Sequence, residues 1–206
     1  MQIRINPTRM ALLRLRKRLV IARRGHKLLK DKLEGLIQVF MPLVEEYGDL
    51  RARVDSELLT TLKFFILAGA VSGAENIETA LNECETKITI TSELRSFMSV
   101  LVPELTLKEF EIHNTYSTVL TTSDFDTACE SLRNIFPSLL ALTNLEETII
   151  RLANEIEKTR RRVNALEYTL IPAITSTVKT IANKLEEYDR SDRARLMKIK
   201  DMLSMD

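Results

Sequence analysis

The sequence has no tryptophan, and aromatic residues account for only 5% of its 206 residues. Glycine and proline are also scarce, with five of each. So few turn-forming residues argue against a loop-rich β-sandwich or β-barrel of this length, and they disfavour a glycine-rich nucleotide-binding fold. Hydrophobic residues make up 45% and charged residues 29%, as in folded chains. The composition favours a protein built of long helices.

Residues that build metal sites or disulfides are equally scarce. Cys84 and Cys129 are the only cysteines, and His26 and His113 the only histidines, without ligand spacing between them. We expect two buried, unreactive thiols, with a disulfide only in an oxidising compartment, and no catalytic residue, metal or cofactor. The sequence contains no signal-peptide core and no uncharged apolar run of 18 residues, so we expect a soluble intracellular protein.

A heptad pattern begins at Leu12 and continues unbroken to Val54. With Leu12 as position a, twelve of thirteen successive a and d positions are apolar or aromatic, and His26 is the exception. Such a run predicts a long helix with one apolar seam, in which His26 is packed or sets the register. The thirteen positions are Leu12, Leu15, Leu19, Ala22, His26, Leu29, Leu33, Leu36, Phe40, Leu43, Tyr47, Leu50 and Val54.

A second heptad run follows Pro137 and extends from Leu145 to Leu170. The pattern then resumes at Ile174 with a shift equivalent to four inserted residues, a stutter that locally unwinds a left-handed coiled coil. Pro172 lies at the same place and removes one hydrogen bond from the helix. The second run predicts a long C-terminal helix that pairs with the first.

Residues 75–135 lack this helical pattern and carry eleven acidic and four basic residues. The runs TKITIT and SFMSVLV are separated by a short, mainly polar gap, Ser92–Arg95. They predict a β-hairpin over about 86–102 whose second strand ends at Pro103. Helix is expected to resume near Ser123, a candidate N-cap residue.

The fold that follows is mainly α. We expect a long antiparallel two-helix coiled coil, formed by an N-terminal helix (1–74) and a C-terminal helix (136–206), with a small central head (75–135) that contains the β-hairpin. If Glu75 and Ser138 flank the head, the numbers of paired residues add up to about 213. This register places His26 near Leu185–Tyr188 and Tyr47 near Leu166.

Charge is unevenly distributed, although the net charge is only +1. Residues 1–35 hold eleven basic and two acidic residues, a net of +9, so the remaining residues sum to −8. This basic segment is either a solvated helix face, a nucleic-acid arm or a surface for an acidic protein. Arg160–Arg162 form a second basic group, whose side chains point about 100° apart around a helix. They predict a solvated or partner-facing collar and not a single phosphate site.

Three sequence strings closely resemble the D subunit of the V-type and A-type rotary ATPases. They are NPTRMALLRLRKRL (6–19), RGHKLLKDK (24–32) and EIEKTRRRVNALEYTLIP (155–172). A fourth string, KLEEYDRSDRARLMKIK (184–200), is similar to the C-terminal helix of that family. The resemblance covers both long helices, and it implies a non-catalytic subunit that acts as the central rotor shaft of the ATPase.

The resemblance also implies partners and a location. The terminal helices enter the hexamer of catalytic A and nucleotide-binding B subunits, the small F subunit binds at the side, and a socket subunit meets the shaft above the membrane ring. The shaft couples ATP hydrolysis or synthesis to proton or sodium transport. It is cytoplasmic and peripheral to the membrane, without membrane insertion or nucleic acid.

The short stretch after the fourth string suggests a bacterial or archaeal complex. The alternative function is that of a coiled-coil nucleic-acid-binding or scaffold protein that uses its basic N-terminal helix. Candidate partner contacts are the basic residues Arg9, Arg16, Lys17, Arg18, Arg24, Lys27, Lys30, Arg160, Arg161 and Arg162.

Overall fold

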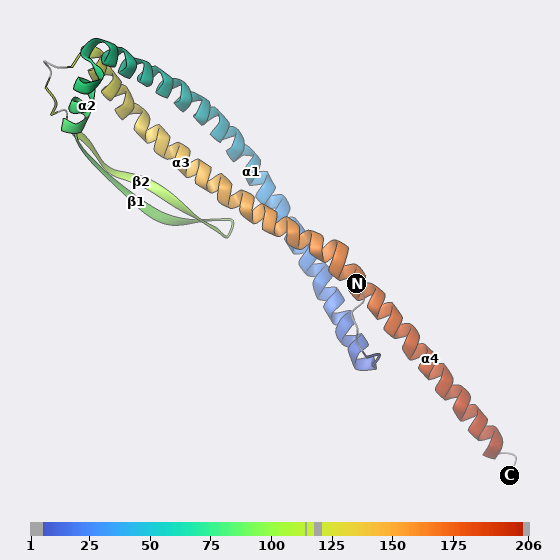
Figure 1. Cartoon of the computed structure of the whole chain (residues 1–206). Helices are drawn as coiled ribbons and strands as arrows, with labels where there is room; N and C mark the ends of the chain where they lie inside the picture. Colours follow the sequence, from blue (N-terminus) through green and yellow to red (C-terminus); the bar gives the residue numbers. More distant parts are fainter. Residues whose placement is uncertain (1–5, 114, 118–120, 204–206) are drawn as a thin grey trace. The chain divides into compact units, whose positions relative to one another are not determined.

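The computed structural model describes residues 6–113, 115–117 and 121–203, apart from the side chains of residues 112, 113 and 203. The expected mainly α fold, with a long helix towards each end of the chain and a β-hairpin between them, is confirmed (Figure 1). The elements in chain order are α1 (Arg9–Ser72), α2 (Ala74–Glu83), β1 (Glu85–Phe97), β2 (Val100–His113), α3 (Ser123–Asn164), the π-helix η1 (Ala165–Leu170) and α4 (Ile171–Leu203).

The chain divides into two compact units. The terminal unit combines Met1–Gly35 with Ile156–Asp206, and the head unit comprises Leu36–Glu155. Helices α1 and α3 therefore each contribute to both units. The three segments expected from the sequence group the residues differently and stay a prediction.

In the terminal unit, the first part of α1 packs antiparallel against η1 and α4. Leu15 of α1 forms the buried core together with Ile174 and Ile181 of α4, and half-buried apolar residues extend this core along both helices. The predicted seam is confirmed in both units, because all thirteen a and d positions from Leu12 to Val54 are buried or half-buried.

The register of this helix pair differs from the predicted one. Arg9 Nη2 lies 2.9 Å from Asp189 Oδ1, and His26 Nε2 lies 3.4 Å from Glu167 Oε2. The numbers of these paired residues add up to 198 and 193, and not to about 213. The expected placement of His26 beside Leu185–Tyr188 is therefore wrong.

The error comes from treating the region after Pro137 as the start of the second helix. In the structure α3 begins at Ser123 and contains Pro137. Because α1 ends at Ser72, the two flanking residue numbers add up to 195, close to the observed register. The expected pairing of Tyr47 with Leu166 belongs to the same wrong register.

The predicted change of heptad phase coincides with η1, which ends two residues before Pro172. A π-helix is a wider turn than an α-helix, and it occurs mostly as single-turn insertions inside α-helices. Pro172 has no N–H to donate to the carbonyl oxygen of Tyr168, four residues earlier. The wider turn accommodates this gap, and both Leu170 and Ile174 remain in the packed core of the terminal unit.

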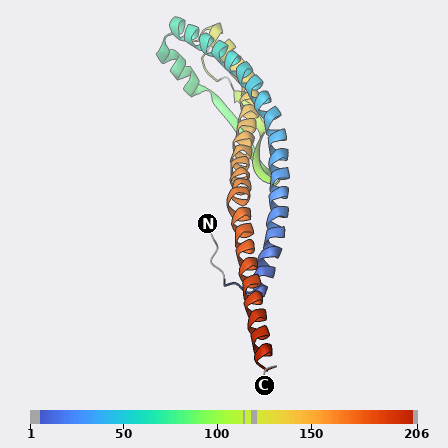
Figure 2. The ribbon, with the colours of Figure 1, turned by 90° about the vertical axis from the view of Figure 1, so that its right-hand side faces the viewer.

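The last part of α4 extends beyond the start of α1. Arg9 is the first residue of α1 and is level with Asp189, so no residue of α1 lies beside the α4 residues that follow Asp189 (Figure 2). Four large apolar residues of this extension are exposed: Leu196, Met197, Ile199 and Met202.

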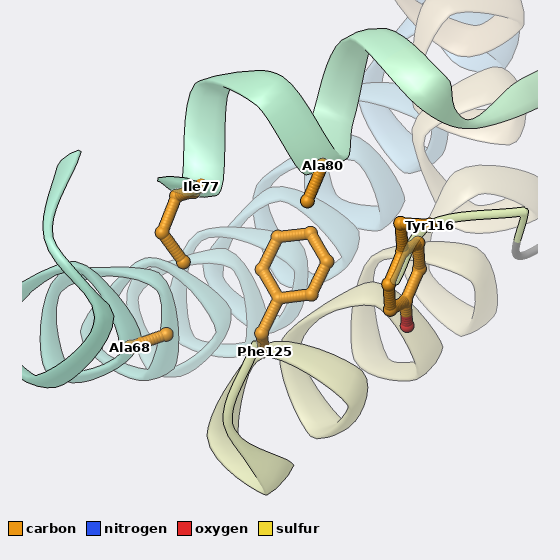
Figure 3. Packing of buried hydrophobic residues seen from close by; sticks show 5 residues of the cluster. All are labelled: Ala68, Ile77, Ala80, Tyr116 and Phe125. Atoms are coloured by element: carbon orange, nitrogen blue, oxygen red, sulfur yellow. The ribbon is translucent and has the colours of Figure 1, made fainter. Parts of the chain in front are cut away.

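The core of the head unit lies between α1, α2 and α3 (Figure 3). Phe125, in the first turn of α3, is the largest fully buried side chain among the described residues. Its ring meets those of Tyr116 and Phe65 edge to face, with centroid distances of 4.9 and 5.9 Å. The buried members of this cluster are Ala68, Ile77, Ala80, Tyr116 and Phe125.

Two side-chain hydrogen bonds connect the described part of the loop before α3 to neighbouring helices. The Tyr116 hydroxyl donates to Oδ1 of Asp126, and the Thr115 hydroxyl donates to the carbonyl oxygen of Glu83 at the end of α2. The helix start near Ser123 is confirmed. The loop is thereby tied to the end of α2 and to the first turn of α3.

The β-hairpin is longer than the expected 86–102, and its turn lies elsewhere. β1 and β2 pair antiparallel along their whole lengths, so the hairpin spans residues 85–113. Met98 and Ser99 form the turn, with φ values of 47° and 68° that match a type I′ turn. The expected turn at Ser92–Arg95 lies inside β1, and the expected end at Pro103 lies inside β2, so both placements are wrong.

Candidate partner-contact surface

All ten candidate contact residues belong to the terminal unit, and all ten are exposed. Two of them form ion pairs: Arg9 with Asp189 across the helix pair, and Arg161 with Glu157 one turn earlier on α3. For the other eight, the structure gives no ion pair with a described residue. Exposed charges of this kind contribute little to folding stability, so they remain available to a partner.

The Arg160–Arg162 triplet lies on an exposed arc of α3. The residues that bracket it, Thr159 and Val163, are buried, so the triplet occupies the turn between two seam positions. In the register set by His26 and Glu167, it lies level with residues 31–33 of α1. The triplet therefore lies close to the level of Lys30. The other candidates on α1 lie further towards the start of that helix.

The two compact units carry opposite net charges. The terminal unit holds 22 basic and 10 acidic residues, a net of +12, whereas the head unit holds 8 basic and 19 acidic residues, a net of −11. The sequence signal from residues 1–35 identifies only part of this separation. Residues 156–206 add eleven basic and eight acidic residues to the same unit, which becomes apparent once the pairing of the helices is known.

His26 lies in the seam, as its heptad position predicts. Its side chain is 21% exposed and faces Glu167 of the π-helix at 3.4 Å. This pair is the one polar contact that the structure gives between α1 and η1 among the described residues. It marks the level at which the second helix changes phase.

The two cysteines are half-buried and pack against the core of the head unit. Burial raises the pKa of the Cys129 thiol to about 11, and nearby Cys84 and Asp126 add to this effect. Burial also raises the pKa of Cys84. Both groups are therefore neutral thiols near pH 7, which supports their interpretation as unreactive residues.

Three other kinds of site can be checked in the structure: a metal site, a cleft and a membrane span. The described residues contain no group of three or more His, Cys, Asp or Glu side chains that could hold a metal ion. A cleft in the head unit is lined by the apolar residues Leu43, Phe97, Val102 and Leu145 together with polar and charged side chains. Within the described ranges, no single helix is long and apolar enough to span a bilayer, although α1 and α2 together, bent by 117°, pass on length and composition alone.

Comparison with known proteins adds a family to this geometry. A family model described as the ATP synthase D subunit matches residues 11–201. The chain is 44% identical to a V-type ATP synthase D subunit from Fusobacterium nucleatum over 208 residues, which cover 100% of this chain and 99% of the relative. It is also 44% identical to proteins of the same name from Thermoanaerobacter pseudethanolicus, covering 98% and 97% of the two chains, and from Acetivibrio thermocellus, covering 98% and 92%.

Proposed function

Because the chain belongs to the family of ATP synthase D subunits, we propose that it is the central rotor shaft of a V/A-type rotary ATPase. In this role it performs no catalysis itself. It transmits rotation between the hexamer in which ATP is hydrolysed or synthesised and a membrane sector that transports protons or sodium ions. The shaft works at the cytoplasmic face, as a peripheral subunit of the complex.

The observation that carries this proposal is the seam. A shaft must resist twisting, and an unbroken series of packed a and d positions supplies that resistance along α1. The shaft must also present different surfaces to three equivalent catalytic interfaces. The shaft can shift a catalytic interface from one state to another only if its contacts with the two states differ in free energy. The uneven charge of the terminal unit provides one source of such differences.

The proposed partners follow from the family and from the charge of each unit. We assign the terminal unit, with its net charge of +12, to the hexamer of A and B subunits. The F subunit and the socket subunit above the membrane ring are the other partners. The ten basic candidates, Arg9 to Lys30 on α1 and Arg160–Arg162 on α3, are proposed contacts within the hexamer.

Affinity purification of the tagged full-length chain from cells tests the proposal. We expect the A, B and F subunits to be retained in fixed proportions, and ATP-driven ion pumping to require the chain when the complex is reconstituted. Retention of nucleic acid at physiological salt, without ATPase subunits, would support the alternative of a nucleic-acid-binding protein. Pumping that is unaffected by omission of the chain would contradict the shaft.

A further inference from the structure

The two edges of the β-hairpin differ in their hydrogen bonds to the rest of the head unit. The edge of β2 faces α3, where Asn144 Oδ1 accepts from the N–H of Leu105 at 2.8 Å and Asn144 Nδ2 donates to the carbonyl of the same residue at 2.8 Å. Arg151 Nη1 donates to the carbonyl of Leu101 at 3.1 Å. Side chains of α3 therefore hydrogen-bond to the backbone of β2 as a neighbouring strand would, and Figure 1 shows β2 on the side of the hairpin that faces α3.

These contacts determine which backbone groups point away from the hairpin. Residues of an antiparallel pair alternate between bonding to the partner strand and pointing outward. The backbone N–H and carbonyl groups of Leu101 and Leu105 point outward. The backbone nitrogen and carbonyl of Pro103, midway between them, therefore point outward too. This position suits a proline, because its missing N–H removes no bond between the strands.

The same alternation identifies the outward groups of β1. Ser92, Leu94 and Ser96 are the partners of Leu105, Pro103 and Leu101, respectively, in the strand pairing. Their N–H and carbonyl groups therefore point away from β2, along the opposite edge of the sheet.

This edge of β1 is open. All three outward residues are exposed, and Leu94 is 71% exposed. No described residue outside the hairpin hydrogen-bonds to their backbone groups. Natural edge strands are commonly blocked by proline or by a bulge, but here the irregularity lies earlier, between Thr89 and Ile90, and β1 contains no proline. The edge is therefore able to accept another strand.

The side chains along this edge indicate the chemistry of the strand that would fit. Glu93 lies directly opposite Glu104, and like charges at such positions destabilise a sheet. Arg95 forms an ion pair with Glu104 at 3.3 Å, whereas the structure gives Glu93 no ion pair with a described residue. A cation beside Glu93 would compensate its charge. On the opposite face, Ile90 and Leu94 expose apolar surface.

We propose that the outer edge of β1, Ser92–Ser96, binds an extended segment of another subunit of the ATPase, which adds a third strand to the hairpin. The segment carries apolar residues at alternate positions, next to Ile90 and Leu94, and a Lys or Arg next to Glu93. This inference rests on the proposed function, because it takes the partner from the same complex.

Hydrogen exchange resolved to single amides tests the proposal on the full-length chain, alone and within the purified ATPase. In the free chain, the amides of Ser92, Leu94 and Ser96 should exchange rapidly, because they point into solvent. In the complex they should exchange at least about tenfold more slowly. The inward amides of Thr91 and Arg95, which bond to β2, should be protected in both samples and report that the hairpin is folded.

Two substitutions at Leu94 separate backbone pairing from side-chain contact. Leu94→Pro removes only an outward N–H and constrains the strand, as Pro103 does opposite, so the hairpin should persist while the protection of Ser92 and Ser96 in the complex is lost. Leu94→Ala, the matched control, retains the N–H and should retain most of that protection. Glu93→Lys should weaken protection more than Glu93→Gln, because it places a cation against the basic residue of the segment.

Three outcomes would overturn the inference. One is equal exchange of the three outward amides in the free chain and in the complex. Another is protection that appears in the free chain and grows with its concentration, because this would identify a second copy of the chain as the partner. The third is protection in the complex that survives Leu94→Pro unchanged. If the chain fails to co-purify with ATPase subunits at all, the proposed function itself fails.

Discussion

At the scale of single residues, the side chains that stabilise the fold differ from those proposed as partner contacts. The fully buried residues lie at seam positions or in the core of the head unit, as Leu36, Leu152 and Phe125 do. The basic candidates lie on exposed arcs between seam positions. Substitutions in the two groups should therefore affect different measurements.

Leu36 is 0% exposed and Leu13 is 52% exposed, although both lie on α1. We expect Leu36→Ala to lower the free energy of unfolding by about 2–5 kcal/mol, because it removes buried contacts and leaves a cavity. The matched control, Leu13→Ala, should change it by less than about 1 kcal/mol. Urea unfolding of the purified chain measures both. Equal losses would show that the seam is not where the structure places it.

The raised pKa of Cys129 predicts how this thiol reacts. Only the thiolate is nucleophilic, and burial holds the pKa at about 11, against an ordinary value of 9.0. In a Cys84→Ser variant, labelling of Cys129 by a thiol reagent should accelerate about tenfold per pH unit from pH 7 to pH 9. Stopped-flow measurements of the rate test this. A rise of only about three- to sixfold between pH 8 and pH 9 would indicate a thiol of ordinary pKa.

At the scale of the elements, the sequence predicts those features that depend on spacing. The seam from Leu12 to Val54 and the change of phase at Pro172 follow from the positions of apolar residues alone, and both are confirmed. The register does not follow from spacing, because a seam of repeating heptads permits pairing at several offsets. It depends on where the head begins, and Pro137 is tolerated inside α3.

The predicted position of the hairpin turn is wrong for a different reason. Type I′ turns need positive φ at both central residues, so they usually contain Asn-Gly or a similar pair. Here Met98 and Ser99 occupy these positions, and neither residue type signals such a turn. The mainly polar stretch Ser92–Arg95 is a stronger turn signal in the sequence but forms part of β1. The partner-contact candidates could be selected by charge, whereas their individual roles depend on subunits outside this chain.

This turn provides a prediction with an internal control. Ser99 has a φ of 68°, a conformation that costs a side-chain-bearing residue roughly 1–2 kcal/mol. Ser99→Gly should therefore stabilise the chain by about 1 kcal/mol. Ser96→Gly, three residues earlier in a regular strand, should destabilise it by about 0.5–1 kcal/mol. Thermal melts of both variants decide the matter, and the same sign for both would contradict the turn.

At the scale of the whole molecule, the opposite charges of the two units suggest different partners for each. A basic terminal unit and an acidic head unit attract surfaces of opposite sign, and such complementarity affects assembly more than folding. The charge separation is not needed for the seam, since the basic candidates lie outside it.

Replacement of Arg16, Lys17 and Arg18 by Ala should therefore impair assembly or torque and leave the fold nearly intact. Each exposed charge contributes only about 0–1 kcal/mol to folding. Thermal melts of the free chain and ATP-driven ion pumping by the reconstituted complex give the two readouts. A control variant that replaces Arg51, Arg53 and Lys63 removes the same charge from the head unit. Variants of the first triplet that melt far lower yet pump normally would show that its charges are structural.

Observation of rotation tests the central claim most directly. A bead would be attached to the head unit through Glu78→Cys, on an exposed position of α2, in a chain whose two native cysteines are replaced by Ser. With the catalytic hexamer fixed to a surface, the account predicts that ATP drives stepwise rotation of the bead in one direction. A bead that stays still while the same complexes hydrolyse ATP would contradict the assignment of this chain as the rotor shaft.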